Sequence, residues 1–310
     1  MADAAHEIQA LLDELVAAGR PSSRTLPLPA GRANFADLIS SVTTVEPLDG
    51  ISEIDVAVAD HDVPVRFYRS ERTTDPGALV VFLHGGGWVF GDIDTHDGMC
   101  RALTRRSGVA LASVDYRRAP EHPYPAALED ACGVVRWVVE HAVELGIDPD
   151  RIAVAGDSSG GNLAAATALR LRDEAGPVLR HQFLLYPALD PGMDSDSYRQ
   201  NADDPFLSAD ELEWYWDQYA PGALREEKYA GVSKAPSLSG LPDAYVLVAG
   251  LDPLHDEGVA YAERLREAGV PTVLSVHDHM PHGFLLFAAK LSESVAGLEE
   301  VGDAISNALR

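Results

Sequence analysis

Apolar side chains along this chain follow two different periods, one typical of strands and one typical of helices. Residues 54–70 alternate apolar and polar positions on each side of an Asp-His turn, which predicts an antiparallel hairpin with one buried face. Six later runs are continuously apolar, as is typical of parallel strands that are buried on both faces. They cover residues 78–85, 109–116, 151–158, 181–188, 244–250 and 271–277.

Longer segments between these runs carry apolar residues three and four positions apart, which predicts amphipathic helices. They cover residues 125–146, 161–176 and 257–269 and a C-terminal stretch from about 284 to 309. Right-handed crossovers would place such helices on both faces of the sheet. The pattern therefore predicts an α/β fold with an eight-stranded, mostly parallel sheet flanked by helices.

Two segments interrupt this alternation. Residues 190–240 have no buried-strand pattern and are rich in aromatic side chains, which predicts a helical cap insertion. Such an insertion would lie over the crevice at the carboxyl ends of the strands, where ligands bind in sheets of this kind. Residues 1–45 are expected to form an N-terminal helical cap segment, and residues 46–189 and 241–310 the two parts of one catalytic α/β domain.

The charge of the chain narrows the choice of partners. Its formal net charge is −25, and only three of its 24 basic residues are lysines. This charge would repel phosphate backbones and anionic lipid headgroups over roughly 8 Å at physiological salt. We therefore expect a small-molecule partner, and neither nucleic acid nor a membrane.

The cysteines and the N-terminus suggest a compartment. Cys100 and Cys132 are too few for a disulfide framework or a thiolate zinc cage, which suits a reducing environment. Residues 1–24 show an acidic amphipathic pattern, without the basic start and apolar core of a signal peptide. These features predict a cytoplasmic protein in which both cysteines fill apolar space on helices.

The strongest chemical signal is the sequence Gly-Asp-Ser-Ser-Gly at 156–160, which stands between a predicted strand and a predicted helix. A sharp turn at such a joint raises the hydroxyl of Ser158 above the sheet, and its glycines permit close backbone contacts. The N-terminus of the following helix adds partial positive charge for a developing oxyanion. Ser158 is therefore the candidate nucleophile; the alternative is a plain turn capped by Asp157 or Ser158.

A second signal, His-Gly-Gly-Gly-Trp at 84–88, ends another predicted strand. Three consecutive glycines cost backbone entropy in an ordered structure, so they indicate a function. Their amides, with no side chain in the way, are suited to bind an oxyanion. A dinucleotide-binding loop is excluded because Phe90 stands where the third glycine of that motif belongs.

A nucleophilic serine needs a base and a carboxylate that orients the base. The segments after the last two predicted strands offer both, in the chain order serine, acid, histidine that this type of site requires. Position alone leaves the choice open. The candidates are Asp252, Asp256 and Glu257 for the acid and His277, His279 and His282 for the base.

Five linked motifs resemble the hormone-sensitive lipase family, the bacterial family IV carboxylesterases of the α/β-hydrolase superfamily. They are HGGGW at 84–88, YRRAPEHPYPAALED at 116–130, GDSSGGNLAAA at 156–166, LDPLHDEG at 251–258 and HGF at 282–284. The resemblance covers essentially the whole chain and implies an α/β-hydrolase fold with a helical cap. It selects Asp252 and His282 as the partners of Ser158, because they stand in the D-P-L and H-G-F motifs.

The resemblance also implies a set of oxyanion donors. In the family, the second and third glycines of H-G-G-G and the residue after the nucleophile supply these amides, and they correspond to Gly86, Gly87 and Ser159. The family usually has alanine where Ser159 stands. Because the backbone N–H is the donor, we expect the function to survive this departure.

By resemblance, the expected function is that of a carboxylesterase for short to medium acyl esters, which acts through an acyl-enzyme and needs no metal or organic cofactor. An amidase, an arylformamidase or a lactonase would use the same three residues. A small-molecule receptor is the alternative from another class, since the plant gibberellin receptor is similar to this family but lacks the histidine that is present here as His282. Dimerisation in the family makes a homodimer a further expectation.

Aromatic residues beside the motifs are candidates to line a substrate pocket. Trp88 follows the three glycines, and Trp214 and Tyr215 lie in the cap insertion. Aromatic residues at helical spacing also commonly serve packing, so this assignment is the least specific of those made from the sequence.

Overall fold

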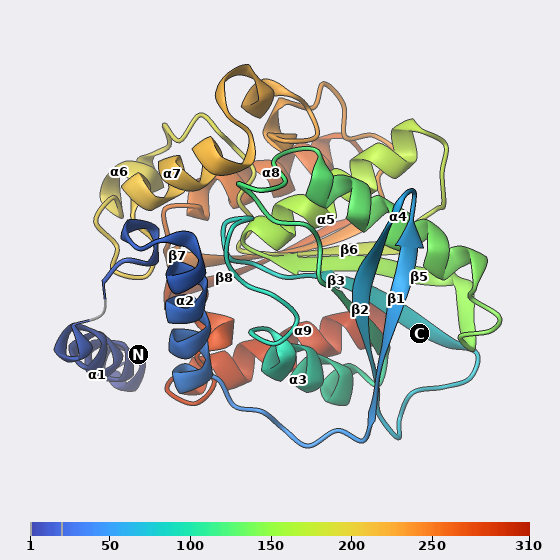
Figure 1. Cartoon of the computed structure of the whole chain (residues 1–310), viewed down its shortest axis with the longest axis horizontal. Helices are drawn as coiled ribbons and strands as arrows, with labels where there is room; N and C mark the ends of the chain where they lie inside the picture. Colours follow the sequence, from blue (N-terminus) through green and yellow to red (C-terminus); the bar gives the residue numbers. More distant parts are fainter. Residues whose placement is uncertain (1, 20) are drawn as a thin grey trace.

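The computed structural model describes residues 2–19 and 21–310. A twisted eight-stranded sheet forms the centre of the protein, and helices cover both of its faces (Figure 1). The strand order is β1-β2-β4-β3-β5-β6-β7-β8, which confirms the predicted α/β fold. The strands are β1 (Gly50–Val58), β2 (His61–Arg69), β3 (Gly77–Leu83), β4 (Ala110–Val114), β5 (Ile147–Asp157), β6 (His181–Leu185), β7 (Asp243–Leu251) and β8 (Thr272–Pro281).

The first two strands differ from the others in direction and in burial. β2 pairs antiparallel with β1 and with β4, whereas the pairs among β3 to β8 are parallel. Buried Val63 and Val65 alternate with exposed Pro64 in β2, whereas every residue of β3 and β4 is buried. The two apolar periods in the sequence therefore correspond to a half-covered edge and a fully covered centre. The prediction of full burial was wrong for β8, because this strand forms the other edge of the sheet and exposes Val273 and Val276.

Helices pack against the sheet in two layers (Figure 1). α4 (Ala126–Glu140), α5 (Ser159–Asp173) and α8 (His255–Glu267) share one apolar core with one face of the sheet. α3 (Asp97–Ser107) and α9 (Ser292–Ala308) share a second core with the other face. No helix within residues 2–19 and 21–310 is both long and apolar enough to cross a membrane.

The helix layer differs from the sequence prediction in three places. A helix was expected over residues 125–146, but α4 ends at Glu140 and residues 141–146 form turns. The C-terminal helix was expected from about residue 284, but α9 begins only at Ser292, and Phe284–Leu286 form a short 3-10 turn, η4. Residues 284–287 are all buried, which one continuous α-helix with a solvent-facing side could not achieve. α3 has no equivalent in the prediction because it is short and rich in polar residues.

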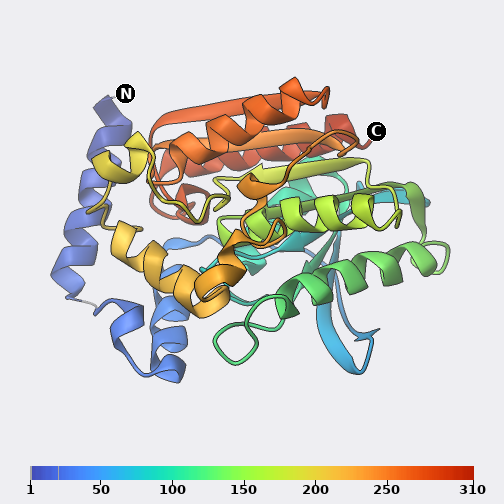
Figure 2. The same cartoon turned by 90° about the horizontal axis from the view of Figure 1, so that it is seen from above.

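The two predicted cap segments lie side by side at one end of the molecule (Figure 2). The first contains α1 (Ala2–Ala18), η1 (Ser23–Thr25) and α2 (Leu28–Val42), and the second contains α6 (Asp196–Gln200), α7 (Ala209–Tyr219), η2 (Gly222–Glu226) and η3 (Val232–Lys234). The Ser22 hydroxyl donates to Glu211 of α7 at 2.7 Å, and Arg24 donates to the carbonyl of Asp210 at 3.1 Å. Segments almost 190 residues apart in the chain therefore contact each other directly.

Candidate active site

Ser158 lies at a strained turn between β5 and α5. β5 ends immediately before this residue and α5 begins immediately after it, and its backbone has φ 56° and ψ −122°. A residue with a Cβ atom rarely adopts such a positive φ. A Cβ atom at Gly156 would collide with the carbonyl of Gly160, and one at Gly160 would collide with the carbonyl of Leu83. The glycines at both ends of the motif therefore allow β3, β5 and α5 to approach closely enough to form this turn.

His282 and Asp252 lie beside Ser158 in space, although the three residues are far apart in the chain. The Nε2 atom of His282 is 2.9 Å from Oγ of Ser158, and its Nδ1 atom is 2.7 Å from Oδ2 of Asp252. The other oxygen of Asp252 accepts the backbone N–H of Leu254 at 2.8 Å. A hydrogen-bonded chain therefore runs from a fully buried carboxylate, through an imidazole, to the hydroxyl at the turn.

The rival acids and histidines have other partners. Asp256 and Glu257 accept hydrogen bonds from backbone N–H groups within residues 189–197, on the segment that follows β6. His277, which lies within β8, contacts carboxylates of α9, and His279 is exposed. These contacts place all four outside the hydrogen-bonded chain.

The charges around His282 favour its protonated form. Burial of the imidazole disfavours the charge, but the carboxylates of Asp252, Asp157 and Asp204 outweigh burial and raise the pKa of His282 above its ordinary value. Burial in turn raises the pKa of Asp204 to about 6. The ring of Tyr186 meets the imidazole edge-on, with 5.1 Å between centroids. Neither Asp204 nor Tyr186 was identified from the sequence, and only the position of Tyr186 directly after a strand gave a signal.

The glycine loop after β3 presents free amides to the chamber that Ser158 lines. Gly86 and Gly87 have φ values of 113° and 62°, and their N–H groups have no hydrogen-bond partner among the residues that the structure describes. Both glycines line the same chamber as Ser158 and Ser159. The three residues that the family resemblance selects as oxyanion donors therefore share one space with the hydroxyl.

This chamber has a volume of about 130 Å³ and mostly apolar walls. The walls come from both cap segments and from the segment after β8, and they include Leu15, Phe35, Leu38, Phe206, Leu212 and Phe287. The N-terminal members were not predicted, because amphipathic helices give no signal about which apolar residues face a ligand. No cluster of three or more His, Cys, Asp or Glu side chains that could hold a metal ion occurs in the described part of the chain.

The aromatic candidates for the pocket have different positions. Trp88 and Tyr215 line the chamber, whereas Trp214 is not among the lining residues and stacks on Phe90 with 5.9 Å between centroids. The Tyr215 ring lies so close to Gly87 that a Cβ atom there would collide with it. α7 therefore contributes a chamber wall directly above the glycine loop.

Leu286, another wall residue, also lines a second cavity of about 90 Å³. This second cavity lies between α3 and α9, and its lining includes Met99, Ala102 and Leu298. Leu286 therefore borders both spaces.

Comparison with known proteins extends this description. Residues 80–286 match the model of a family described as having the alpha/beta hydrolase fold. Carboxylesterase NlhH of Mycobacterium tuberculosis is 45% identical over 231 residues, which make up 73% of this chain and 72% of that protein. The chain belongs to the hormone-sensitive lipase family. Ethyl acetate hydrolase of Pseudomonas putida is similar over a longer stretch, with 37% identity over 311 residues and 96% of each chain covered.

Solved structures of esterases agree with this membership of the hormone-sensitive lipase family. A thermostable esterase from Pseudomonas putida ECU1011 superposes with a TM-score of 0.93 at 35% identity and covers 98% of this chain and 97% of that one. The ester hydrolase EH1AB1 from the metagenome of Lake Arreo, complexed with a bipyridine phosphonate derivative, gives 0.93 at 33% identity and covers 97% of each chain. The fold is therefore shared over almost the whole length, including both cap segments.

Proposed function

We propose that this chain is a carboxylesterase in which Ser158 is the nucleophile, His282 the general base and Asp252 the residue that orients the imidazole. Membership of the family, with its named carboxylesterases and esterases, supports hydrolysis of carboxylic esters. The observation that carries the assignment of residues is the hydrogen-bonded chain from Asp252 through His282 to Ser158, with contacts of 2.7 and 2.9 Å. These distances are within the range in which a base can take the proton of a hydroxyl.

The reaction that fits this arrangement proceeds through an acyl-enzyme. The hydroxyl oxygen of Ser158 attacks the ester carbonyl while His282 takes its proton, and His282 then returns that proton to the departing alcohol. Water, deprotonated by the same histidine, attacks the acyl-enzyme and releases the carboxylic acid and the free serine. Asp252 keeps Nδ1 of the imidazole protonated and stabilises the positive charge that forms in each step.

The negative oxygen of each tetrahedral intermediate would be bound by the amides of Gly86, Gly87 and Ser159. The free amides of the glycine loop support this role, because a donor that is already engaged could not bind the oxyanion. A single donor of this kind contributes roughly 2.7 to 4 kcal/mol to the stability of the transition state in comparable sites.

The walls of the chamber indicate the class of ester. Apolar side chains from both caps dominate the lining, so an uncharged acyl group of short to medium length fits better than a charged one. The P. putida relative is named for hydrolysis of ethyl acetate, which is consistent with a small neutral substrate.

A substrate series would test this proposal. p-Nitrophenyl esters from acetate to dodecanoate should be hydrolysed, with the highest kcat/KM at short or medium chains, and a fluorophosphonate probe should label the parent protein and leave Ser158→Ala unlabelled. A matching anilide and a lactone belong in the same series. Faster turnover of either would change the reaction class to amidase or lactonase, and absence of both turnover and labelling would favour a receptor.

A further inference from the structure

The two residues that flank the nucleophile in sequence both reach across to the glycine loop. The side chain of Asp157 accepts the backbone N–H of Gly85 at 2.8 Å. The hydroxyl of Ser159 accepts the backbone N–H of Trp88 at 3.1 Å. Gly85 and Trp88 are the residues immediately before and after the Gly86–Gly87 pair, so the two bonds enclose the pair on both sides.

Asp157 is packed against a buried histidine. The Nε2 atom of His96 lies 3.3 and 3.4 Å from the two oxygens of Asp157, and both residues are almost fully buried. The N–H of Gly85 lies 3.2 Å from the same Nε2 atom, and Nδ1 lies 3.0 Å from the Thr95 hydroxyl, which donates to the carbonyl of Asp92 at 2.8 Å. His96 therefore contacts both members of the Asp157–Gly85 pair.

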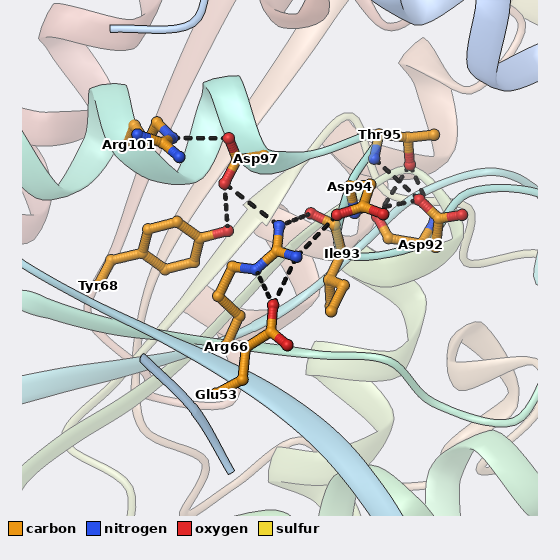
Figure 3. A network of polar contacts seen from close by, with 9 residues as sticks. All are labelled: Glu53, Arg66, Tyr68, Asp92, Ile93, Asp94, Thr95, Asp97 and Arg101. Carbon is orange, nitrogen blue, oxygen red and sulfur yellow. Dashed lines mark hydrogen bonds and ion pairs between the residues drawn. The ribbon is translucent and has the colours of Figure 1, made fainter. Parts of the chain in front are cut away.

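His96 directly precedes α3 and ends the loop of residues 92–96. Figure 3 shows the polar contacts of residues 92–95 in this loop. Asp92 accepts the N–H groups of Asp94 and Thr95 at 3.1 and 2.8 Å, which closes a tight turn. Arg66 of β2 binds Asp94 at 2.7 Å and so ties this turn to the sheet. The loop that carries His96, the neighbour of Asp157, is thus attached to the antiparallel part of the sheet.

Ser159 provides the only partner that the described residues offer to the N–H of Trp88. Trp88 has a positive φ of 59° and is 1% exposed, and its ring stacks on Tyr219 with 4.4 Å between centroids. A buried N–H without an acceptor is costly, so removal of the hydroxyl would favour a different backbone conformation at Trp88.

We propose that Asp157 and Ser159 are positioning residues, whose side chains set the amides of Gly86 and Gly87 relative to Ser158. The inference rests on the proposed function, because it assumes that these amides bind the oxyanion. Consecutive glycines have wide conformational freedom, whereas an oxyanion site loses much of its effect when its donors are displaced by about 1 Å. Attachment of the loop to both neighbours of the nucleophile makes the amides and the attacking oxygen parts of one rigid unit.

Ser159→Ala is the sharpest test, since it deletes one acceptor and keeps the backbone donor of residue 159. The family usually has alanine at this position, but in this chain the Ser159 hydroxyl is the one acceptor that the described residues offer to the N–H of Trp88. We therefore expect kcat for p-nitrophenyl butyrate to fall by about tenfold, with KM changed by less than about twofold, because donors that act in the transition state are displaced. The affinity for a trifluoromethyl ketone, whose adduct places a negative oxygen in the site, should fall by a similar factor.

Ser107→Ala is the matched control. Ser107 is also buried, and its hydroxyl also accepts a backbone N–H, that of Val109, at 3.1 Å, but it lies at the end of α3. This variant should lose thermal stability and keep its kcat and its affinity for the ketone. If Ser159→Ala behaves in the same way, with kcat and ketone affinity within twofold of the parent, Ser159 has only a structural role and the inference is wrong.

A pair of variants tests Asp157. Asp157→Ala removes the nearer acceptor for the N–H of Gly85 and leaves Nε2 of His96 at 3.2 Å, whereas Asp157→Asn retains a side-chain oxygen at the same place. Asparagine should therefore restore at least half of the kcat and of the ketone affinity that alanine loses, and equal losses in two folded variants would contradict the proposal. Ser158→Ala distinguishes failure of the proposed function from failure of the positioning role. If Ser158→Ala still hydrolyses esters, the proposed function is wrong. If Ser158→Ala is inactive while the Ser159 and Asp157 variants keep the kcat of the parent, only the positioning role is wrong.

Discussion

The reactivity assigned to Ser158 depends on a proton acceptor within hydrogen-bond reach, and His282 lies at that distance. Replacement of Ser158 by alanine removes the attacking oxygen, and replacement of His282 by alanine removes the base. Each variant should therefore hydrolyse p-nitrophenyl butyrate about 10⁴-fold more slowly than the parent enzyme, measured as kcat.

His279→Ala and Asp256→Asn are the controls for the base and the acid. His279 is exposed and Asp256 binds a backbone N–H of the cap insertion, so both variants should retain most of the turnover. Asp252→Asn should lose activity while it remains folded. Greater damage from Asp256→Asn than from Asp252→Asn would show that the acid has been assigned to the wrong residue.

Asp204 links the cap insertion to the pH dependence of the reaction. His282 must be neutral to take a proton, and the negative charge of Asp204 is one of the causes that raise its pKa. Asp204→Asn removes this charge, so the pKa of His282 should fall and the acid limb of kcat/KM should move to lower pH. A pH profile of ester hydrolysis measures the shift, with the exposed neighbour Asp203 replaced by asparagine as control. An acid limb that stays in place would mean that Asp204 does not act on the imidazole.

Individual site residues were predictable where a motif fixes their surroundings. The context of a strand and a helix identified Ser158, whereas only the family resemblance separated Asp252 and His282 from their neighbours. Asp204 and Tyr186 could not be found in this way, because their relation to His282 arises from the packing of three distant segments.

At the level of secondary structure, α7 contributes Leu212 and Tyr215 to the walls of the chamber. The Tyr215 ring lies against Gly87, in the chamber that Ser158 also lines. Tyr215→Ala should therefore raise the ratio of octanoate to acetate hydrolysis by about tenfold, because one or two additional methylene contacts change kcat/KM by about this factor. A chain-length series of p-nitrophenyl esters measures this ratio.

Trp214→Ala is the matched control for this change in specificity. Trp214 is the preceding residue on α7 and stacks on Phe90 outside the chamber, so its removal should leave the ratio of octanoate to acetate hydrolysis unchanged. If both variants shift the ratio alike, the change comes from a looser α7 and not from the space that Tyr215 occupies.

The helices also show which elements can be predicted from the helical spacing of apolar residues. α4, α5 and α8 have apolar faces and were predicted, although α4 is six residues shorter at its end than expected, but α3 is dominated by polar residues. Its end carried a usable signal, since Arg105 and Arg106 precede Gly108, which has φ 72°. The segment from 284 was predicted as a helix because its apolar residues satisfy a helical period, although all four residues 284–287 are buried.

The net charge of −25 acts on the protein as a whole. Like charges repel each other in the compact state, and added salt screens this repulsion. An increase in NaCl from 20 to 300 mM should therefore stabilise the fold by about 1 kcal/mol and raise Tm by about 2 °C. Thermal unfolding followed by circular dichroism measures the change, and KM for an uncharged ester should stay constant over the same range. A Tm that falls with salt would mean that favourable ion pairs outweigh the repulsion.

The arrangement of the whole molecule followed from the sequence as far as the sheet and its two helix layers. The sequence also led us to expect that the two segments together form a cap, but the residues that join them were not predicted, because no pattern relates residues 22–24 to residues 210–211. The boundaries of the caps, the cytoplasmic location and the homodimer stay predictions, and sedimentation of the purified protein would test the last of these.

Leu286 borders two hollows whose volumes are about 130 and 90 Å³. We expect its exchange for alanine to enlarge the chamber toward the gap between α3 and α9, because a large side chain that lines both hollows is shortened. Hydrolysis of octanoate relative to acetate should then rise, and an unchanged ratio would show that the two hollows stay separate. One substitution in the short turn η4 would in that case alter chain-length preference while every motif stays intact.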